Sequence, residues 1–353
     1  MKTIPVRTAS ASYSIFLERG LLDGLGALLA QRRPGSRAFV VSDHTVWPLY
    51  GGRMRASLAA VGVAHVPHVV PAGEPSKSGA TLFELYAALA KGGFSRSDTV
   101  VALGGGVIGD LAGMAAATYL RGMGFVQVPT TLLAQVDSSI GGKVAVDLPE
   151  GKNLVGAFYQ PGFVVIDPDV LATLPDGQFS SGMGEVIKHA AIANAALFER
   201  LERLGSRRAL GRGLPGILAE NLKIKRAVVE RDEQDNGPRM VLNFGHTIGH
   251  ALEKQAGYTG LAHGAAVAMG MCHITERSEA MGFTEPGTAV RLAALCRAFG
   301  LPDRLPDGSR QGLLATMALD KKVRGGTITL SLLRRVGQAE LVTIPTARLE
   351  DYL

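Results

Sequence analysis

The chain has 353 residues, of which 46% are hydrophobic and 19% are charged. This much apolar side chain excludes a disordered protein, and the 45 glycines follow no collagen period, which excludes a fibrous one. The 37 basic and 31 acidic residues give a formal net charge of +6, yet the basic residues are dispersed and aromatic residues make up only 6%. A nucleic-acid binder normally clusters its positive charge, so we expect an anionic small-molecule partner and no nucleic acid.

Cysteine content and hydropathy indicate the compartment. The two cysteines, Cys272 and Cys296, form no CxxC motif, which fits a reducing cytosol. The first residues contain no apolar core of a secretory signal. The longest stretch without Asp, Glu, Lys or Arg, Gln255–Thr275, carries two histidines and several glycines and reads poorly as a membrane span. We therefore expect a cytoplasmic protein without membrane association.

The first half of the chain alternates between strand and helix patterns. Short β-branched or aromatic runs bounded by Gly, Pro or Asp predict buried strands, and helical patterns lie between them. This alternation, which continues to about residue 175, predicts a parallel sheet covered by helices. The predicted strands are 38–42, 98–103, 125–128 and 163–166, and the helices include 80–91 and 110–120.

The second half reads mainly as helices, with strand-like sequence only near 327–333. We place the domain boundary at 178, which gives an α/β domain over 1–178 and a mostly α-helical domain over 179–353. The predicted helices are 181–203, 217–231, 247–255, 264–281 and 289–299.

A glycine-rich turn follows the strand 98–103 and opens a helix. Gly104, Gly106 and Gly109 satisfy G-x-G-x-x-G, a pattern in which glycines let the backbone approach a pyrophosphate at a helix N-terminus. The acidic residue usual about 20 positions later is missing, but Asp43, at the end of an earlier strand, could bind the ribose hydroxyls. The alternative is a turn that serves packing alone. The first interpretation predicts a Rossmann-like nucleotide-binding domain.

The segment 129–153 is dense in small hydrogen-bonding residues. Lys143 and Lys152 lie beside glycines, where an ammonium can reach phosphate or carboxylate oxygens with little steric hindrance. The alternative is a solvated loop with ordinary surface lysines.

Histidines and a carboxylate predict a metal site in the second half. Glu185 and Lys188 lie at i, i+3, an arrangement also typical of a surface ion pair. His246 and His250 lie at i, i+4, and His263 follows 13 residues later. Three histidines and a glutamate suit a catalytic zinc with three protein ligands. Spacing leaves the three ligands open, and a rival set is His246, His250 and Glu253.

Six ordered blocks make the chain resemble 3-dehydroquinate synthase, a family of the sugar-phosphate cyclase superfamily. The similarity runs from Asp43 to Lys322. The blocks are GGGVIGDLAG, RGMGFVQVPTTLLAQVDSSIGGKVAVD, GKNLVGAFYQP, GMGEVIKHA, LNFGHTIGHALE and HGAAVAMGM.

The resemblance implies NAD in the first domain, Zn²⁺ or Co²⁺ and substrate in the second, and a homodimer. It implies Glu185, His246 and His263 as metal ligands, His250 as catalytic base and Asp235 in proton transfer. The implied substrate contacts are Arg121, Asp137, Lys143, Asn153, Lys188, Lys225, Arg239, Asn243, Lys321 and Lys322. The implied NAD contacts are Asp43, Gly73, Glu74, Pro75, Ser76, Lys77, Gly106, Val107, Ile108, Gly109, Asp110, Thr130, Thr131, Lys143, Lys152, Val170, Leu171, Ala172 and Thr173.

The implied reaction converts 3-deoxy-D-arabino-heptulosonate 7-phosphate into 3-dehydroquinate and phosphate, a step of aromatic amino-acid biosynthesis. In this family NAD⁺ oxidises the C5 alcohol, phosphate is eliminated, NADH returns the hydride, and an intramolecular aldol reaction closes the ring. The resemblance thus implies a lyase without net redox change.

The chain departs from the family pattern at four positions. Asp235 and Ala265 stand where glutamates are usual, Gly124 where an arginine is frequent and Gly184 where an alanine is frequent. Rival functions are another sugar-phosphate cyclase, a metal-dependent polyol dehydrogenase of the same architecture, and an inactive NAD-binding regulator.

Overall fold

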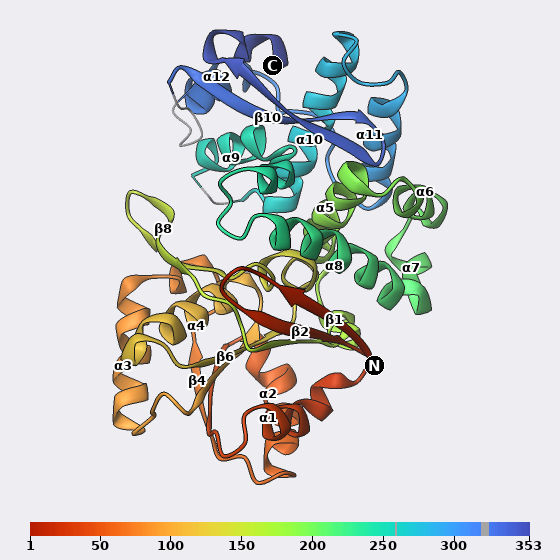
Figure 1. Ribbon diagram of the computed structural model, residues 1–353. Coiled ribbons are helices and arrows are strands. Elements are labelled where there is room, and N and C mark those ends of the chain that lie inside the picture. The colour runs from red at the N-terminus through yellow and green to blue at the C-terminus, as the bar shows by residue number, and fades with distance from the viewer. Residues whose placement is uncertain (258–259, 319–324) are drawn as a thin grey trace. The chain divides into compact units, whose positions relative to one another are not determined.

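The computed structural model describes residues 1–257, 260–318 and 325–353. The chain divides into two compact units, Met1–Leu174 and Pro175–Leu353 (Figure 1).

The first unit contains a seven-stranded sheet in the order β1-β2-β9-β6-β5-β3-β4. All neighbouring strands are parallel except the hairpin β1–β2, which adds an antiparallel edge. The four predicted strands are confirmed as β3, β5, β6 and β9. The bounds are β1 Lys2–Arg7, β2 Ser12–Leu17, β3 Ala38–Asp43, β4 His65–Val70, β5 Thr99–Gly104, β6 Gly124–Pro129 and β9 Phe163–Ile166.

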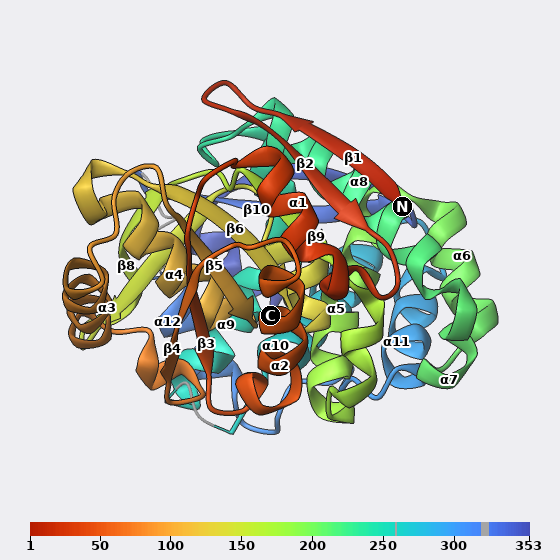
Figure 2. The same ribbon diagram turned by 90° about the horizontal axis from the view of Figure 1, so that it is seen from below.

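Helices cover both faces of this sheet (Figure 2). Alternate strand residues point to opposite faces, so Val40 and Val101 pack with α1 and α2 while Phe39 and Val100 pack with α3 and α4. Both faces are buried, which explains the continuous apolar runs of the central strands. The helix bounds are α1 Leu25–Arg32, α2 Val46–Ala59, α3 Gly79–Lys91 and α4 Gly106–Thr118. The short helices are η1 Leu21–Gly24, η2 Glu74–Ser76, η3 Tyr119–Arg121, η4 Ala134–Ser138 and η5 Pro168–Thr173.

The order of the strands places a topological switch point between β3 and β5. The chain leaves β3 for β4 on one side and then returns to β5 on the other. Connections from β3 and β5 therefore diverge at their carboxyl ends, where ligands bind in open α/β sheets. A separate hairpin of β7 Lys143–Leu148 and β8 Gly151–Phe158 completes the unit. The polar segment 129–153 enters this hairpin at residue 143.

The second unit is mainly helical. The predicted helix 181–203 is two helices, because Asn194 interrupts the pattern and its Oδ1 accepts a hydrogen bond from the Leu197 amide at 3.0 Å. The helices are α5 Asp176–Ala193, α6 Ala195–Leu204, α7 Arg207–Leu210, α8 Leu214–Arg231, α9 His246–Gln255, α10 His263–Ala280, α11 Thr288–Ala298 and α12 Arg310–Ala318. A hairpin of β10 Thr327–Arg335 and β11 Gln338–Pro345 and the short helices η6 Gly211–Gly213, η7 Pro238–Asn243 and η8 Thr346–Tyr352 accompany them.

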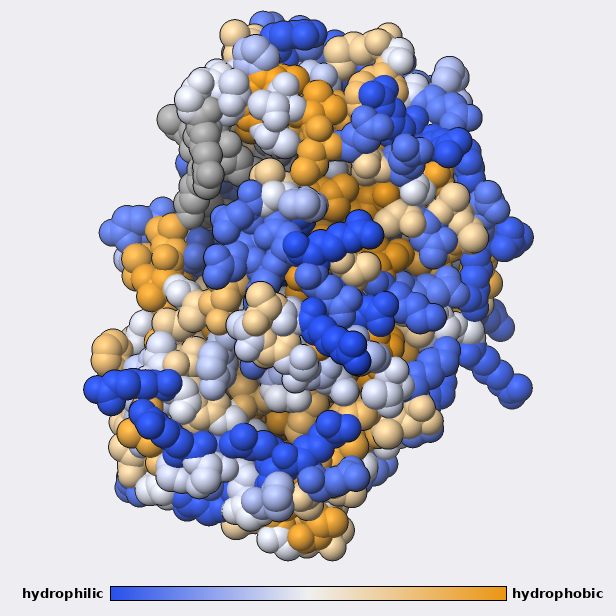
Figure 3. Space-filling model, viewed as in Figure 1, coloured by the Kyte–Doolittle hydropathy of each residue, from blue (hydrophilic) through white to orange (hydrophobic). Residues whose placement is uncertain are grey.

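On the face of the first unit seen in Figure 3, hydrophilic side chains are interspersed with apolar ones. Among the described residues, no helix is both long and apolar enough to cross a membrane. Cys272 and Cys296 are buried free thiols, and contact with Cys272 together with burial raises the pKa of Cys296.

Candidate functional site: a cofactor edge and a metal centre

The glycine-rich turn joins β5 to α4. A Cβ on Gly109 would lie 2.7 Å from Gln127 Oε1, and one on Gly113 would lie 2.3 Å from Val144 Cγ1. These two glycines therefore allow α4 to pack closely on the sheet and the hairpin, which is the role of the third glycine in dinucleotide-binding turns. Packing accounts for only part of the motif, since the nearest atom to a Cβ on Gly106 would be the movable Ser138 Oγ at 3.2 Å.

The predicted cofactor residues gather at the carboxyl edge of the sheet. Asp43 ends β3, and its Oδ1 accepts hydrogen bonds from the amides of Thr45 at 2.8 Å and Val46 at 2.9 Å. Thr130 follows β6 directly, and η5, which contains Val170–Thr173, follows β9. Because β3, β5, β6 and β9 are parallel, their ends meet on one side of the sheet.

Lys77 is the centre of a charged cluster at this edge. Its ammonium lies 2.9 Å from Glu74, 3.4 Å from Asp110 and 3.6 Å from Asp147, and donates to Asn153 Oδ1 at 2.8 Å. Burial raises the pKa of Asp110 to about 7, although the Lys77 ammonium opposes the shift.

Lys152 also belongs to the charged cluster around Lys77. Lys152 lies 3.5 Å from Glu74, so two of the three predicted cofactor lysines, Lys77 and Lys152, share one carboxylate. Asp147 was not predicted, because the strand that carries it, β7, was not among the predicted strands.

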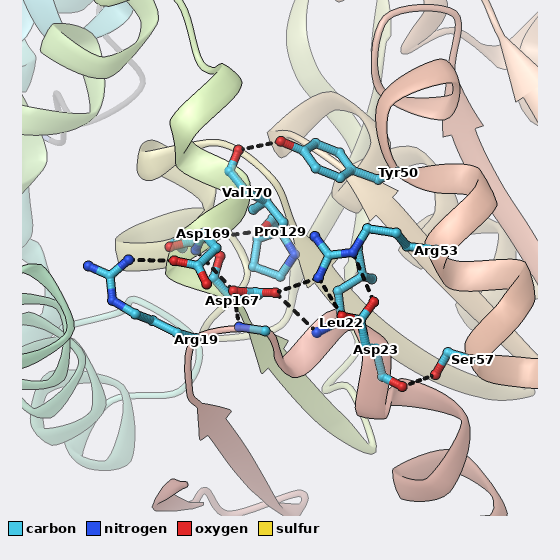
Figure 4. A network of polar contacts seen from close by, with 12 residues as sticks. Arg19, Leu22, Asp23, Tyr50, Arg53, Ser57, Pro129, Asp167, Asp169 and Val170 are labelled. Atoms are coloured by element: carbon cyan, nitrogen blue, oxygen red, sulfur yellow. Dashed lines mark hydrogen bonds and ion pairs between the residues drawn. The ribbon is translucent and has the colours of Figure 1, made fainter.

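A buried aspartate anchors the segment that leads into η5 (Figure 4). Asp167 is 1% exposed, and its carboxylate accepts hydrogen bonds from the amides of Gly20 at 2.9 Å, Leu22 at 3.2 Å and Asp169 at 2.9 Å. Arg53 of α2 lies 3.7 Å from the same carboxylate. From the same helix, the Tyr50 hydroxyl donates to the Val170 carbonyl at 2.8 Å. These contacts fix the position of Val170–Thr173 relative to α2.

The second unit brings together three potential metal ligands. Atoms of Glu185, His246 and His263 all lie within 4.8 Å of one another. Each imidazole directs Nε2 at Glu185 Oε1, at 3.6 Å for His246 and 3.7 Å for His263. Two ligand atoms on a tetrahedral zinc are about 3.4 Å apart when each bond is about 2.0–2.1 Å. Separation and donor chemistry therefore both fit a zinc-type ion.

Protonation also distinguishes the two histidines. Burial, followed by the nearby Lys188 ammonium, lowers the pKa of His246 well below its usual range, which favours the neutral imidazole that binds metals. Burial acts in the same direction on His263, but hydrogen bonds and attraction from Glu185 and Glu253 outweigh it and raise its pKa to about 10.

The remaining predicted residues of this unit vary in exposure. Lys188, Lys225 and Arg239 are buried, and Lys188 forms an ion pair with Glu185 inside the unit rather than on its surface. His250 is exposed on α9, with its ring centroid 5.3 Å from that of His246. Asp235 has a positive φ of 58° in the turn before η7. Lys321 and Lys322 lie outside the described residues.

Glycines set the approach of α5 to α10 beside the predicted metal ligands. A Cβ on Gly264 would lie 1.9 Å from the Ser181 carbonyl oxygen, and one on Gly184 would lie 2.9 Å from the Gly264 carbonyl oxygen. Gly184, where the family pattern frequently has alanine, thus adjoins the backbone of the residue that follows His263. Glu185 and His263 are positioned by this contact.

Residues 67–181 match the model described as 3-dehydroquinate synthase N-terminal, and residues 182–323 match the model described as 3-dehydroquinate synthase C-terminal. The 3-dehydroquinate synthase of Clostridium acetobutylicum is 44% identical over 353 residues, covering 100% of this chain and 99% of that protein.

Among solved structures, 2-epi-5-epi-valiolone synthase from Streptomyces hygroscopicus subsp. jinggangensis 5008, with NAD⁺ and Zn²⁺ bound, has a TM-score of 0.88 and 29% identity over 97% of this chain and 96% of its own. A 2-deoxy-scyllo-inosose synthase complexed with carbaglucose-6-phosphate, NAD⁺ and Co²⁺ has a TM-score of 0.89 and 25% identity over 99% and 98%. The likeness in fold and the full-length match in sequence show that this chain belongs to the 3-dehydroquinate synthase family.

Proposed function

We propose that this chain is a 3-dehydroquinate synthase, which converts 3-deoxy-D-arabino-heptulosonate 7-phosphate into 3-dehydroquinate and phosphate. The observation that carries the proposal is the cluster of Glu185, His246 and His263, with the buried Lys188 ammonium against Glu185, in a chain that matches this family over its whole length.

We assign NAD to residues 1–178 and the metal to 179–353, and we propose substrate contacts from residues of both ranges. When bound, NAD⁺ supplies a hydride acceptor and Zn²⁺ or Co²⁺ supplies a Lewis acid. The carboxyl ends of β3, β5, β6 and β9 offer the cofactor a turn, hydroxyl groups and a carboxylate, while the donor set of the second unit would hold the metal.

The chain's own residues supply charge stabilisation and proton transfer. The Lys188 ammonium would stabilise negative charge as it develops on a substrate oxygen, and His250 would accept and return protons, assisted by Asp235. The substrate carries a carboxylate and a phosphate, so cationic and amide side chains would bind it. These residues are Arg121, Lys143, Asn153, Lys225, Arg239, Asn243, Lys321 and Lys322.

Arg239 is prepared for such a role by its surroundings. It is 3% exposed, and its Nη1 donates to the Glu233 carbonyl at 2.6 Å. Its own amide donates to Asp232 Oδ2 at 3.1 Å. The turn that contains Asp235 therefore also holds the Arg239 guanidinium in place.

We further propose a cytoplasmic homodimer.

Product analysis tests the function. Supplied with the heptulosonate phosphate, NAD⁺ and zinc, the protein should release phosphate and form a carbocycle while NADH does not accumulate. Stoichiometric NADH would indicate a polyol dehydrogenase. Turnover of another open-chain sugar phosphate, with none of the heptulosonate, would indicate a different cyclase of the superfamily.

A further inference from the structure

A carboxylate outside the ligand set contacts one of the histidines. Glu253 lies on α9, three residues after His250, and its side chain is 11% exposed. Its Oε1 is 3.4 Å and its Oε2 3.5 Å from Nδ1 of His263. Nothing in the proposed reaction requires this glutamate to contact substrate or cofactor.

The contact is on the side of the imidazole that faces away from the ligand set. Nε2 of His263 faces Glu185, while Nδ1 faces Glu253. A carboxylate that accepts the Nδ1 proton leaves the Nε2 lone pair available to a metal and fixes the plane of the ring. His246 has an equivalent arrangement, because its Nδ1 lies 3.1 Å from the Phe244 carbonyl oxygen.

We propose that Glu253 is a positioning residue of the metal centre, which holds His263 in the Nδ1-protonated tautomer with Nε2 directed at the ion. The inference rests on the proposed function only for the presence of the metal. Metal-bound histidines usually donate their second nitrogen to a carboxylate or carbonyl group, and loss of that partner lowers metal affinity about 10–100-fold.

A competing arrangement makes Glu253 itself a ligand. Atoms of His250, Glu253 and His263 also lie within 4.8 Å of one another. One imidazole cannot direct both nitrogens at the same ion, so this arrangement would separate His263 from Glu185. The buried position of Glu185 between two Nε2 atoms favours the first arrangement.

Zinc affinity of the metal-free protein tests the proposal, measured by competition with a chromophoric chelator. The zinc Kd should rise about 10–100-fold in Glu253→Ala and by less in Glu253→Gln, whose amide oxygen can still accept the Nδ1 proton. Glu276→Gln is the matched control, because Glu276 is an exposed glutamate of α10, and its zinc Kd should equal that of the unchanged protein. Urea unfolding of each metal-free variant checks the fold.

Cobalt absorption separates positioning from ligation. The Co²⁺ bands of Glu253→Gln should match those of the unchanged protein, since the ligand set is intact. Unchanged zinc affinity in Glu253→Ala would overturn the proposal. Altered Co²⁺ bands in Glu253→Gln, together with a loss of zinc affinity in that variant as large as the loss in His263→Ala, would also overturn it. A protein that shows the expected dependence on Glu253 but releases no phosphate would refute the proposed function and support this inference.

Discussion

The burial of Lys188 decides whether this lysine forms a surface ion pair with Glu185 or belongs to the interior of the site. An exposed i, i+3 pair with Glu185 would stabilise a helix by only about 0.2–0.5 kcal/mol. Lys188 is instead 1% exposed and Glu185 is fully buried. A buried ammonium beside the ligand set can act on developing negative charge with little screening by water.

We expect Lys188→Ala to lower kcat by at least about 100-fold, or about 2.7 kcal/mol, the scale of one lost oxyanion donor. The Kd for NAD⁺ should not change, because the cofactor is assigned to the other unit. Lys223→Ala, an exposed lysine of α8, is the control and should retain full turnover. Steady-state kinetics and NAD⁺ titration check both. Near-normal turnover of Lys188→Ala would leave this lysine with a structural role only.

The raised pKa of Asp110 predicts that the free energy of unfolding of the cofactor-free protein depends on pH. Its pKa is raised from 3.8 to about 7 in the folded protein, so the folded state retains a proton that the unfolded state loses at lower pH. The resulting stabilisation is fully present below about pH 4 and is lost as pH rises to about 7. The free energy of unfolding of the unchanged protein, minus that of Asp110→Asn, should therefore fall over this range and then level off.

Urea unfolding at a series of pH values measures this difference. A difference that increases with pH would mean that Lys77 outweighs burial and keeps Asp110 ionised.

At the scale of elements, two aspartates near the start of η5 contribute unequally. Asp167 accepts three backbone hydrogen bonds while buried, whereas Asp169 forms an exposed ion pair with Arg19 (Figure 4). Asp167→Ala should lower the free energy of unfolding by at least about 2 kcal/mol, because buried amides lose their acceptor. Asp169→Ala should change it by less than about 1 kcal/mol. Equal effects in urea unfolding would contradict this assignment.

Elements with a simple pattern were predictable and those with conflicting residues were not. The strands 38–42 and 163–166 are buried on both faces, so their apolar runs are continuous and their limits clear. Helix α2 was not predicted, because Pro48 and two glycines lie within it. Gly51 leaves room there for the Trp47 ring, which would lie 2.5 Å from a Cβ at this position.

For the proposed metal centre, the sequence indicated the types of the ligand residues but could not show which three residues form the set. Spacing showed that His246 and His250 share a helix face, yet it could not rank them, and the resemblance alone favoured His246 as the ligand. The structure places His246 and His263 around Glu185, and His250 outside that set. Glu253 lies on α9 and His263 on α10. Their contact joins two helices, and the spacing of residues along one helix cannot reveal it.

At the scale of the whole molecule, each compact unit has a proposed ligand of its own. A ligand that binds only the folded state stabilises it by about 2.7 kcal/mol at 100 times its Kd. We expect NAD⁺ to slow amide exchange at the carboxyl ends of β3 and β5, and zinc to slow it in α5, α9 and α10. Hydrogen-exchange mass spectrometry measures both. Protection of α9 by NAD⁺ alone, or of β3 by zinc alone, would contradict the assignment of ligands to units.

The crossing of α5 and α10 has a consequence for how the proposed metal centre is organised before an ion arrives. Gly184 and Gly264 bring the two backbones into contact with no intervening side chain. No rotamers therefore need to be ordered between Glu185 and His263 when an ion binds. The entropy loss of bringing these two ligands together belongs to the folding of the unit, which leaves the metal site preorganised.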